Sequence, residues 1–216
     1  VGPTGAITIK KETQKVWDAI YDKNIRVIAQ IAPAVRVALG EEFGLKPGEV
    51  TIGKIASILR KIGIDEVYDT ALSADLTVME ESNEFLERFS KNENLPLLTS
   101  CCPAWVQFAE NKYPELAKNI STCKSPQQMF GTVAREVFNK KDKEDGKETF
   151  IVSIMPCTAK KAEASRPEFS HDGVREVDLV LTTQELAIMI KEVGVNFHTI
   201  EEESLDMPFG IASGAG

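Results

Sequence analysis

The sequence predicts an α/β fold: an open, mainly parallel twisted sheet flanked by helices. Short apolar runs of strand length alternate with longer runs whose apolar residues recur at helical spacing. This alternation is typical of parallel strands joined by crossover helices. The chain has 216 residues, of which 43% are hydrophobic and 27% charged, so it is long enough to bury a core and to form one or two domains.

The first predicted strand covers residues 26–32, a β-rich run that ends at Pro33, which has no N–H for a ladder. We expect a helix over 35–43, which Gly44 ends. The spacing of isoleucine and leucine then predicts a helix over 51–62.

The middle of the chain continues the alternation. Residues 66–69 are predicted as a short strand and residues 74–89 as a long helix. A further strand is expected over 95–99.

The last third contains the clearest buried strand, Phe-Ile-Val-Ser-Ile-Met at 150–155. A charged segment with a glycine, 140–147, precedes it and is predicted as a surface loop. Another strand is expected over 177–181, followed by a helix over 183–193 that ends at Gly194.

Charge and hydropathy exclude several classes of protein. The net charge of −8 argues against a nucleic-acid partner, which needs clustered Lys and Arg. No apolar run reaches the roughly 20 residues of a membrane span, and the first residues lack the layout of a signal peptide. We therefore expect a cytoplasmic protein.

Two cysteine motifs carry the chemistry. Thr-Ser-Cys-Cys-Pro-Ala-Trp occupies 99–105, and Met-Pro-Cys-Thr-Ala-Lys-Lys occupies 155–161. Adjacent cysteines rarely form a disulfide with each other, whereas thiolates are good iron ligands. Each motif follows a predicted strand, and parallel sheets bind ligands at the carboxyl ends of their strands, so we expect the motifs to converge. The fourth cysteine, Cys123, is interpreted as a buried small hydrophobe.

These two motifs resemble the first two signature motifs of the FeFe-hydrogenases. Residues 31–36, 74–81 and 124–128 resemble the same family, and the resemblance runs over essentially the whole chain. It implies a catalytic domain that holds the H-cluster, a 4Fe-4S cubane linked to a two-iron centre with carbon monoxide, cyanide and a dithiolate. The implied reaction is the reversible reduction of protons to H2.

The resemblance implies a role for each cysteine of the motifs. Cys102 and Cys157 would ligate the cubane, and Cys101 would be a proton donor. Neighbouring side chains of an extended segment point to opposite sides, which agrees with different roles for Cys101 and Cys102. A thiol with a pKa of roughly 8.5 can give up a proton without remaining ionised.

The resemblance also assigns a proton relay to Glu81, Glu84, Ser121 and Arg88. Glu81 and Glu84 are one helical turn apart and thus share a face. A glutamate pair at this spacing is more often a solvated helix face, so the pattern alone does not establish the relay.

Further site residues follow from the same resemblance. Lys160, three residues after Cys157, would donate to a cyanide, and Glu163 would pair near it. The residues that correspond to the lining of the two-iron pocket are Ala32, Pro33, Ser125, Gln127, Met155 and Pro156.

In that family a later motif with two further cysteines supplies the other two of the four cubane ligands. This sequence lacks that motif. We interpret residues 1–24 as the remnant of a ferredoxin-type segment, with Gly2 where a cysteine would stand, and a connecting helix. Residues 25–216 would be the first lobe of the catalytic domain. The isolated chain is therefore predicted to be inactive. The complete protein would carry additional 4Fe-4S clusters, and its partners would be ferredoxin or NAD-linked electron-transfer subunits and cluster maturation proteins.

Two alternatives from other classes stay open. A non-catalytic relative could serve in redox or H2 sensing or in iron-sulfur cluster assembly, although it would need neither Cys101 nor the relay. A thiol oxidoreductase could use Cys101 and Cys102, but Cys-x-x-Cys is absent. His171 and His198 lack the spacing of a zinc helix and are predicted to be surface residues.

Overall fold

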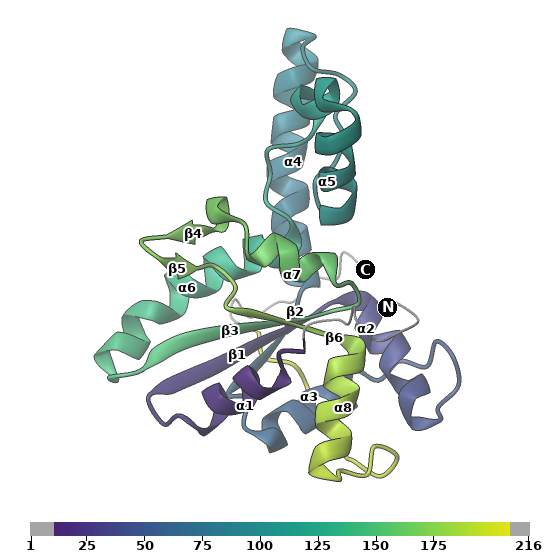
Figure 1. The fold of residues 1–216 in the computed structure, drawn as a ribbon, viewed down its shortest axis with the longest axis vertical. Coiled ribbons are helices and arrows are strands. Elements are labelled where there is room, and N and C mark those ends of the chain that lie inside the picture. Colours follow the sequence, from purple (N-terminus) through teal and green to yellow (C-terminus); the bar gives the residue numbers. More distant parts are fainter. Residues whose placement is uncertain (1–10, 208–216) are drawn as a thin grey trace, which may run out of the picture.

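A four-stranded parallel sheet forms the centre of the molecule in the computed structural model, which describes residues 11–207 (Figure 1). The strand order is β2-β1-β3-β6, with β1 at Ile25–Ile31, β2 at Glu66–Asp69, β3 at Glu148–Met155 and β6 at Leu179–Thr182. All three pairings are parallel. The predicted open parallel sheet is confirmed. The predictions about Gly2 and the chain ends concern residues outside the described range.

The two central strands are apolar on both faces. In β1 the last five residues are buried, and so are the last five of β3. A strand that reads as a continuous apolar run fits a sheet with helices on both sides. Side chains of β1 and β3 belong to one core cluster that also includes residues of β2, β6 and the surrounding helices.

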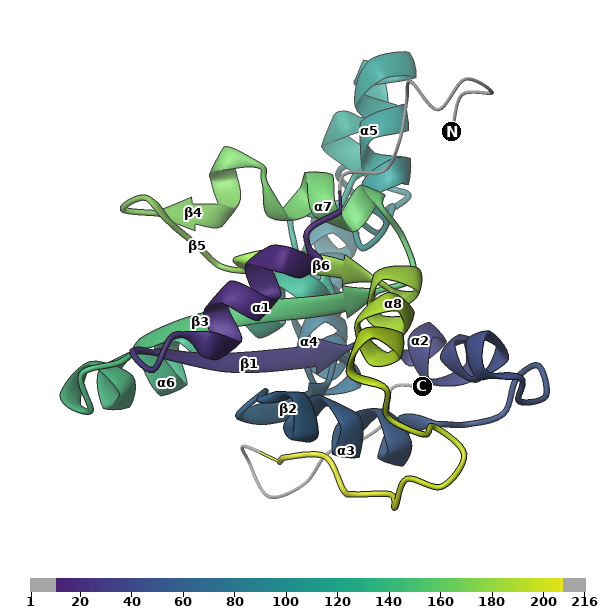
Figure 2. The same ribbon diagram turned by 60° about the horizontal axis from the view of Figure 1, so that its bottom comes forward.

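Helices cover both faces (Figures 1 and 2). The helices α1 (Thr13–Tyr21), α3 (Ile52–Ile62) and α8 (Thr183–Val193) lie on one face, and α6 (Pro126–Glu144) lies on the other. Gly63 ends α3 with a φ of 108°, and a Cβ there would approach Ile20 to 2.6 Å, so only glycine fits.

The expected helix over 35–43 is two shorter elements. Helix α2 spans Pro33–Ala38, and the 3-10 helix η1 spans Leu39–Phe43. The predicted loop over 140–147 is wrong for its first half, because α6 continues to Glu144. Asp142 in its last turn is buried against Arg26 and Thr149, which holds this charged stretch in helical form.

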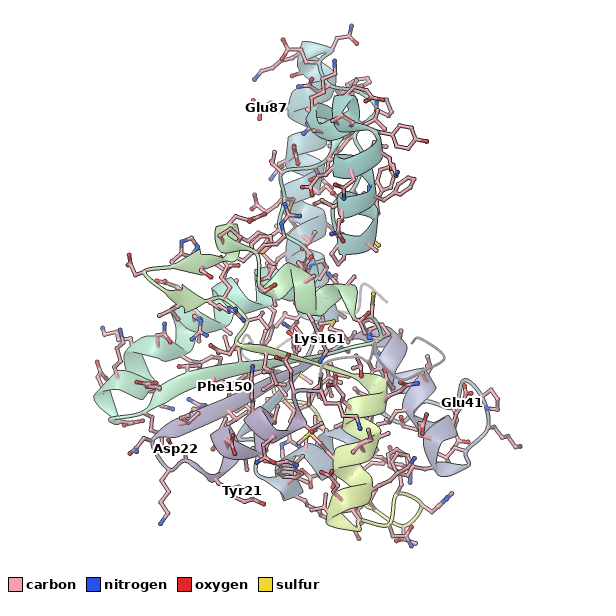
Figure 3. All side chains as sticks on the ribbon, viewed as in Figure 1. Tyr21, Asp22, Glu41, Glu87, Phe150 and Lys161 are labelled. Atoms are coloured by element: carbon pink, nitrogen blue, oxygen red, sulfur yellow. The ribbon has the colours of Figure 1, made fainter. Side chains whose placement is uncertain are left out.

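An arm projects from the sheet (Figure 1). It contains α4 (Ala71–Lys91), α5 (Pro103–Lys112) and the 3-10 helix η2 (Pro114–Asn119). With 21 residues, α4 is about 32 Å long at 1.5 Å per residue. Glu87 lies toward its far end (Figure 3).

The arm explains why the strand predicted over 95–99 is wrong. The chain leaves α4 far from the sheet, so this segment cannot join it. Pro96 lacks an N–H, and the described segment makes only an isolated bridge between Leu98 and Ile120. The first cysteine motif therefore follows no strand of the sheet.

The elements between β3 and β6 complete the fold. They are α7 (Ala159–Ala164), the 3-10 helix η3 (Pro167–Phe169) and a two-stranded hairpin of β4 (Ser170–His171) and β5 (Val174–Arg175). Lys161 of α7 pairs with Glu185 of α8 at 2.8 Å and ties the two helices together (Figure 3). Within residues 11–207, every helix is too short or too polar to cross a bilayer.

Candidate metal and proton-transfer site

The two cysteine motifs meet through a lysine. Cys102 stands at the N-cap of α5, and Cys157 follows β3 after one residue. Lys160, in the first turn of α7, donates from Nζ to the backbone oxygen of Cys101 at 2.8 Å. The expected convergence thus occurs, but this contact joins the second motif to the arm and not to a strand of the sheet.

Lys160 belongs to a buried polar cluster. Glu163 is 4% exposed, and its carboxylate accepts from Lys160 at 3.0 and 3.1 Å, from Ser125 Oγ at 3.0 Å and from Gln127 Nε2 at 2.9 Å. All these partners donate, so the cluster holds Glu163 as an anion beside a lysine cation.

The start of α6 builds the wall of this cluster. Ser125 is the N-cap and accepts from the N–H of Gln128, while Pro126 occupies the first helical turn, where a missing N–H costs nothing. The Ser125 hydroxyl therefore caps α6 and also donates to Glu163. Among the described residues, Gln127 Oε1 and both amide atoms of Gln128 are buried without a hydrogen-bond partner.

The cysteine thiols within the described residues fit the role of ligands on one side of an iron-sulfur cluster. All four cysteines are free, and Cys101, Cys102 and Cys157 are exposed, which is unusual for cysteines that only pack. The amide oxygen of Gln127 has no partner, while its Nε2 donates to the carbonyl of Lys160, so an unpartnered polar atom lies in the same cluster as Lys160. No group of three or more metal-ligating side chains occurs within residues 11–207. The residues therefore fit part of such a group, with two thiolates from Cys102 and Cys157.

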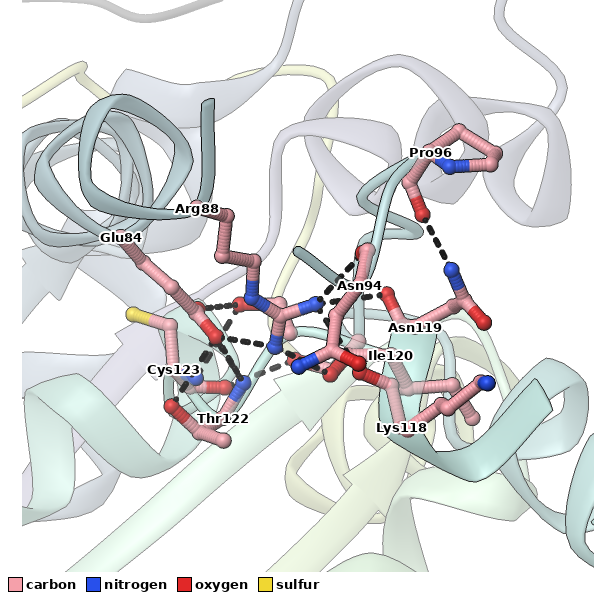
Figure 4. Close-up of polar contacts among 11 residues, drawn as sticks. Glu84, Arg88, Asn94, Pro96, Lys118, Asn119, Ile120, Thr122 and Cys123 are labelled. Atoms are coloured by element: carbon pink, nitrogen blue, oxygen red, sulfur yellow. Dashed lines mark hydrogen bonds and ion pairs between the residues drawn. The ribbon is translucent and has the colours of Figure 1, made fainter. Parts of the chain in front are cut away.

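A second unit surrounds Glu84 on α4 (Figure 4). Ser121 Oγ donates to Glu84 Oε2 at 2.6 Å, and Arg88 Nη2 donates to Oε1 at 2.5 Å. The N–H of Thr122 lies 3.1 Å from both carboxylate oxygens, and Thr122 Oγ1 donates to Oε1 at 3.2 Å. Partial burial would raise the pKa of Glu84, but the bonds from Ser121, Thr122 and Arg88 outweigh it and hold that pKa below its ordinary value.

Arg88 also binds backbone (Figure 4). Its Nη1 lies 3.1 to 3.3 Å from the carbonyl oxygens of Asn94, Lys118 and Asn119, and its Nη2 donates to that of Ile120 at 3.0 Å. The guanidinium thus fastens α4 to the segment that leads to Ser121. Both terminal nitrogens of Arg88 thus make bonds that hold the arm together.

Glu81 is separate from that unit. Among the described residues no hydrogen bond joins Glu81 to Ser121 or Glu84, although Glu81 is only partly exposed on the same helix. Its charge acts on Cys123, whose pKa is raised by burial first and then by Glu81, Glu80 and Glu84. Cys123 is only partly buried, so its interpretation as a buried small hydrophobe is wrong in degree, and its Sγ contacts the carbonyl of Thr77 at 3.8 Å.

One cavity connects both units. It has a volume of about 410 Å³ and lies between α5, the 120–125 segment, α7 and η3. Ser121, Thr122 and Cys123 line one side, and Ser125 and Glu163 line another. Side chains assigned to the relay and to the metal pocket thus face the same space.

The remaining predicted pocket residues stand at the strand ends. Ala32 donates from its N–H to the oxygen of Ile154 at 3.0 Å just past β1, and Pro33 begins α2. Met155 is the buried last residue of β3, while Pro156 is exposed.

Thr122 was missed by reasoning from the sequence. Its position between Ser121 and Cys123 was a signal, because a Ser-Thr pair in a turn can hydrogen-bond a nearby carboxylate through both hydroxyls. His171 and His198 are exposed, as predicted, and His171 Nε2 lies 3.1 Å from the buried carboxylate of Glu176.

Comparison with known proteins gives consistent matches. Residues 25–216 match the family model of the iron-only hydrogenase large subunit, C-terminal domain. The chain is 45% identical to the NADP-reducing hydrogenase subunit HndD of Solidesulfovibrio fructosivorans, with 100% of this chain and 38% of the relative covered. It is 43% identical to iron hydrogenase 1 of Clostridium pasteurianum, covering 99% of this chain and 37% of that protein.

The fold agrees with a solved structure of the same kind. Apo FeFe-hydrogenase HydA1 from Chlamydomonas reinhardtii superposes with a TM-score of 0.84 at 40% identity, covering 95% of this chain and 53% of that one. Cytosolic iron-sulfur assembly component 3 of Mus musculus is 35% identical over 91% of this chain. The chain spans less than half the length of these curated hydrogenases.

Proposed function

We propose that this chain, which belongs to the iron-only hydrogenase large-subunit family, forms one side of a site that reversibly reduces protons to H2. The observation that carries the proposal is the contact between the two cysteine motifs through Lys160, beside a cavity that Ser121 and Thr122 also line. Ser100 and Pro103 of the first cysteine motif line this cavity together with Ser121, Thr122 and Glu163, so the cavity lies next to both that motif and the proton-carrying groups.

Cys102 and Cys157 are the proposed thiolate ligands of the H-cluster, which when bound supplies the redox chemistry of the reaction. Ala32, Pro33, Ser125, Gln127, Met155 and Pro156 are proposed to line its pocket. Lys160 and Glu163 keep a fixed cation beside the two thiols, because the burial of Glu163 leaves Lys160 as its charge partner. A fixed cation stabilises negative charge that arises nearby.

Proton supply is proposed to run along the arm. The Cys101 thiol exchanges a proton with the site, and Glu81, Ser121 and Glu84 carry protons between that thiol and solvent. Arg88 acts in this proposal by orienting Glu84, because a guanidinium stays protonated and cannot itself pass a proton on.

The whole activity is proposed for a larger assembly than the described residues. Two thiolates do not complete a cubane, so we expect the isolated 216 residues to be inactive. Electrons would be exchanged with ferredoxin or, as the name of the NADP-reducing relative suggests, with NAD-linked subunits. Additional 4Fe-4S clusters, maturation proteins and a cytoplasmic location belong to the same proposal.

Anaerobic reconstitution with iron and sulfide tests the ligand assignment. Iron per chain and the electron paramagnetic resonance spectrum are measured for the wild type and for Cys102→Ser, Cys157→Ser and Cys123→Ser. Loss of iron from the first two variants and its retention in the third support the proposal. Equal loading of all four proteins would contradict it, and H2 evolution by the isolated chain would contradict the predicted inactivity.

Iron-sulfur cluster assembly is the alternative that a specific observation favours, since relatives with that name match at 35–36% identity. The hydrogenases match at 43–46%, which favours the enzyme. Transfer of a loaded cluster from this chain to an apo iron-sulfur protein, without H2 turnover in the assembled protein, would support the alternative. Redox or H2 sensing would instead leave the cluster in place.

A further inference from the structure

The carboxylate of Glu84 has partners of two kinds (Figure 4). The N–H of Thr122 and the guanidinium of Arg88 can only donate. The hydroxyls of Ser121 and Thr122 can both donate and accept. Among the described residues, these two hydroxyls are therefore the only protein groups bonded to Glu84 that can exchange a proton with it.

The two hydroxyls bind different oxygens and differ in exposure. Ser121 binds Oε2 and is 5% exposed, whereas Thr122 binds Oε1 and is exposed. The N–H of Cys123 donates to Ser121 Oγ at 3.1 Å, which directs the Ser121 hydroxyl hydrogen toward Glu84. Both residues line the cavity, but Ser121 is buried and Thr122 is the more exposed of the two.

We propose that Thr122 is the solvent-side proton-transfer residue for Glu84, with its hydroxyl as the step between cavity water and the carboxylate. This inference rests on the proposed function, because it supplies the outer end of that proton route. Thr122 lines the cavity of about 410 Å³, so water reaches its hydroxyl.

The transfer balances without any further reactant. A hydronium ion in the cavity gives a proton to Thr122 Oγ1 and becomes water, while the Oγ1–H bond of Thr122 breaks and its proton bonds to Glu84 Oε1. The neutral carboxyl then turns about its Cγ–Cδ bond and presents its O–H to Ser121. Ser121 takes this proton while its own hydroxyl proton passes to the carboxylate of Glu81, the next carrier of the proposed route, so that Glu84 returns to a carboxylate and Glu81 becomes the neutral acid.

Arg88 does not compete for this role. Its N–H groups face four backbone carbonyls as well as Glu84, so it orients the charged carboxylate before and after each transfer, and the neutral carboxyl, which binds Arg88 less strongly, turns in between. Within residues 11–207, the hydrogen-bond partners of Glu84 include no lysine and no histidine. Thr122 thus stands between the carboxylate and the cavity.

The first test uses the metal-free chain. Thr122→Val keeps the shape and the N–H but removes the hydroxyl, Thr122→Ser keeps the hydroxyl, and the exposed Thr199→Val is the matched control. The titration of the Glu84 carboxyl carbon is followed by nuclear magnetic resonance. We expect the pKa of Glu84 to rise in Thr122→Val, because a donor to its charged form is lost. The same pKa should be unchanged in Thr122→Ser and Thr199→Val. An unmoved pKa in Thr122→Val overturns the proposal.

The second test uses the complete, metal-loaded hydrogenase. Thr122→Val is expected to lower H2 evolution about tenfold at alkaline pH, where proton supply limits turnover, and by less in acid. Thr122→Ser and Thr199→Val keep the wild-type pH profile. A wild-type profile in Thr122→Val overturns the transfer role but leaves the proposed function standing. A wild-type protein that takes up metal yet makes no H2 overturns both.

Discussion

Replacing Arg88 by Met tests whether this residue fastens the arm together. In the structure the guanidinium lies within 3.3 Å of the carbonyl oxygens of Asn94, Lys118, Asn119 and Ile120. It also pairs with Glu84. Methionine keeps the apolar stem and removes all five contacts.

The loss of stability expected in Arg88→Met follows from the number of N–H groups that the guanidinium can donate. Three carbonyls share the two hydrogens of Nη1, and Nη2 serves Ile120 and Glu84, so we count the guanidinium as about three good bonds to the segment. At about 1 kcal/mol each, since freed carbonyls can reach water here, Arg88→Met costs about 3 kcal/mol. That corresponds to an increase of about 100-fold in local opening.

Hydrogen exchange of two backbone amides measures this local opening. The N–H of Leu98 donates to the oxygen of Asn119 at 2.8 Å, and the N–H of Ser121 donates to that of Leu98 at 2.7 Å. Both should exchange about 100-fold faster in Arg88→Met. The matched control is Lys91→Met on the same helix, whose ion pair with Glu87 is more than half exposed and contributes little. Wild-type exchange of Leu98 and Ser121 in Arg88→Met would refute the reasoning.

Three further predictions concern other parts of the molecule. Lys160→Met leaves the buried charge of Glu163 without its cation and should lower the free energy of unfolding by about 3 kcal/mol in urea titrations. Combining Lys160→Met with Glu163→Gln should recover part of that loss. An unchanged free energy of unfolding in Lys160→Met would show that the pair does not hold the motifs together. The folded-state pKa of Glu84 is lowered, so its stabilisation is full above the unfolded pKa of roughly 4 and is lost as the pH falls through the folded value. The stability difference between wild type and Glu84→Gln should therefore shrink on acidification below roughly pH 4, and a constant difference would contradict the assignment. Gly131→Ala places a Cβ 2.6 Å from the backbone oxygen of Glu176 and should cost about 2 kcal/mol in thermal unfolding, whereas Thr132→Ala, one position along α6, should cost less.

The central strands were predictable from the sequence because burial on both faces leaves a continuous apolar run. Residues 150–155 and 26–32 differ from β3 and β1 by one or two positions at their ends. The ends of α3 and α8 were also predictable from the glycines that follow them, since the left-handed conformation at a helix end favours glycine.

The arm was not predictable in this way. Its contacts are polar and long-range, and they depend on where a 21-residue helix delivers the chain. The apolar residues at 95–99 have the composition of a strand, but no sheet edge is within reach. The two motifs meet all the same, because Lys160 reaches the carbonyl of Cys101, and a backbone acceptor leaves no trace in the sequence.

The site was predictable in its residue types and less so in its connections. The spacing of Glu81 and Glu84 correctly places them on one helix, yet only Glu84 bonds Ser121. Thr122 escaped attention because half of its contact with Glu84 is made by its N–H, which every residue except proline carries.

The strand order also sets the order of events during synthesis. The first strand, β1, finds its long partner β3 more than one hundred residues later, so the central pairing of the sheet cannot form until the chain has been made to Met155, although β2 can pair with β1 earlier. Cys101 and Cys102 leave the ribosome before that moment, and Lys160 leaves after it. The contact between the two cysteine motifs therefore cannot form before β3 has been made, and it brings together segments made on either side of that central strand.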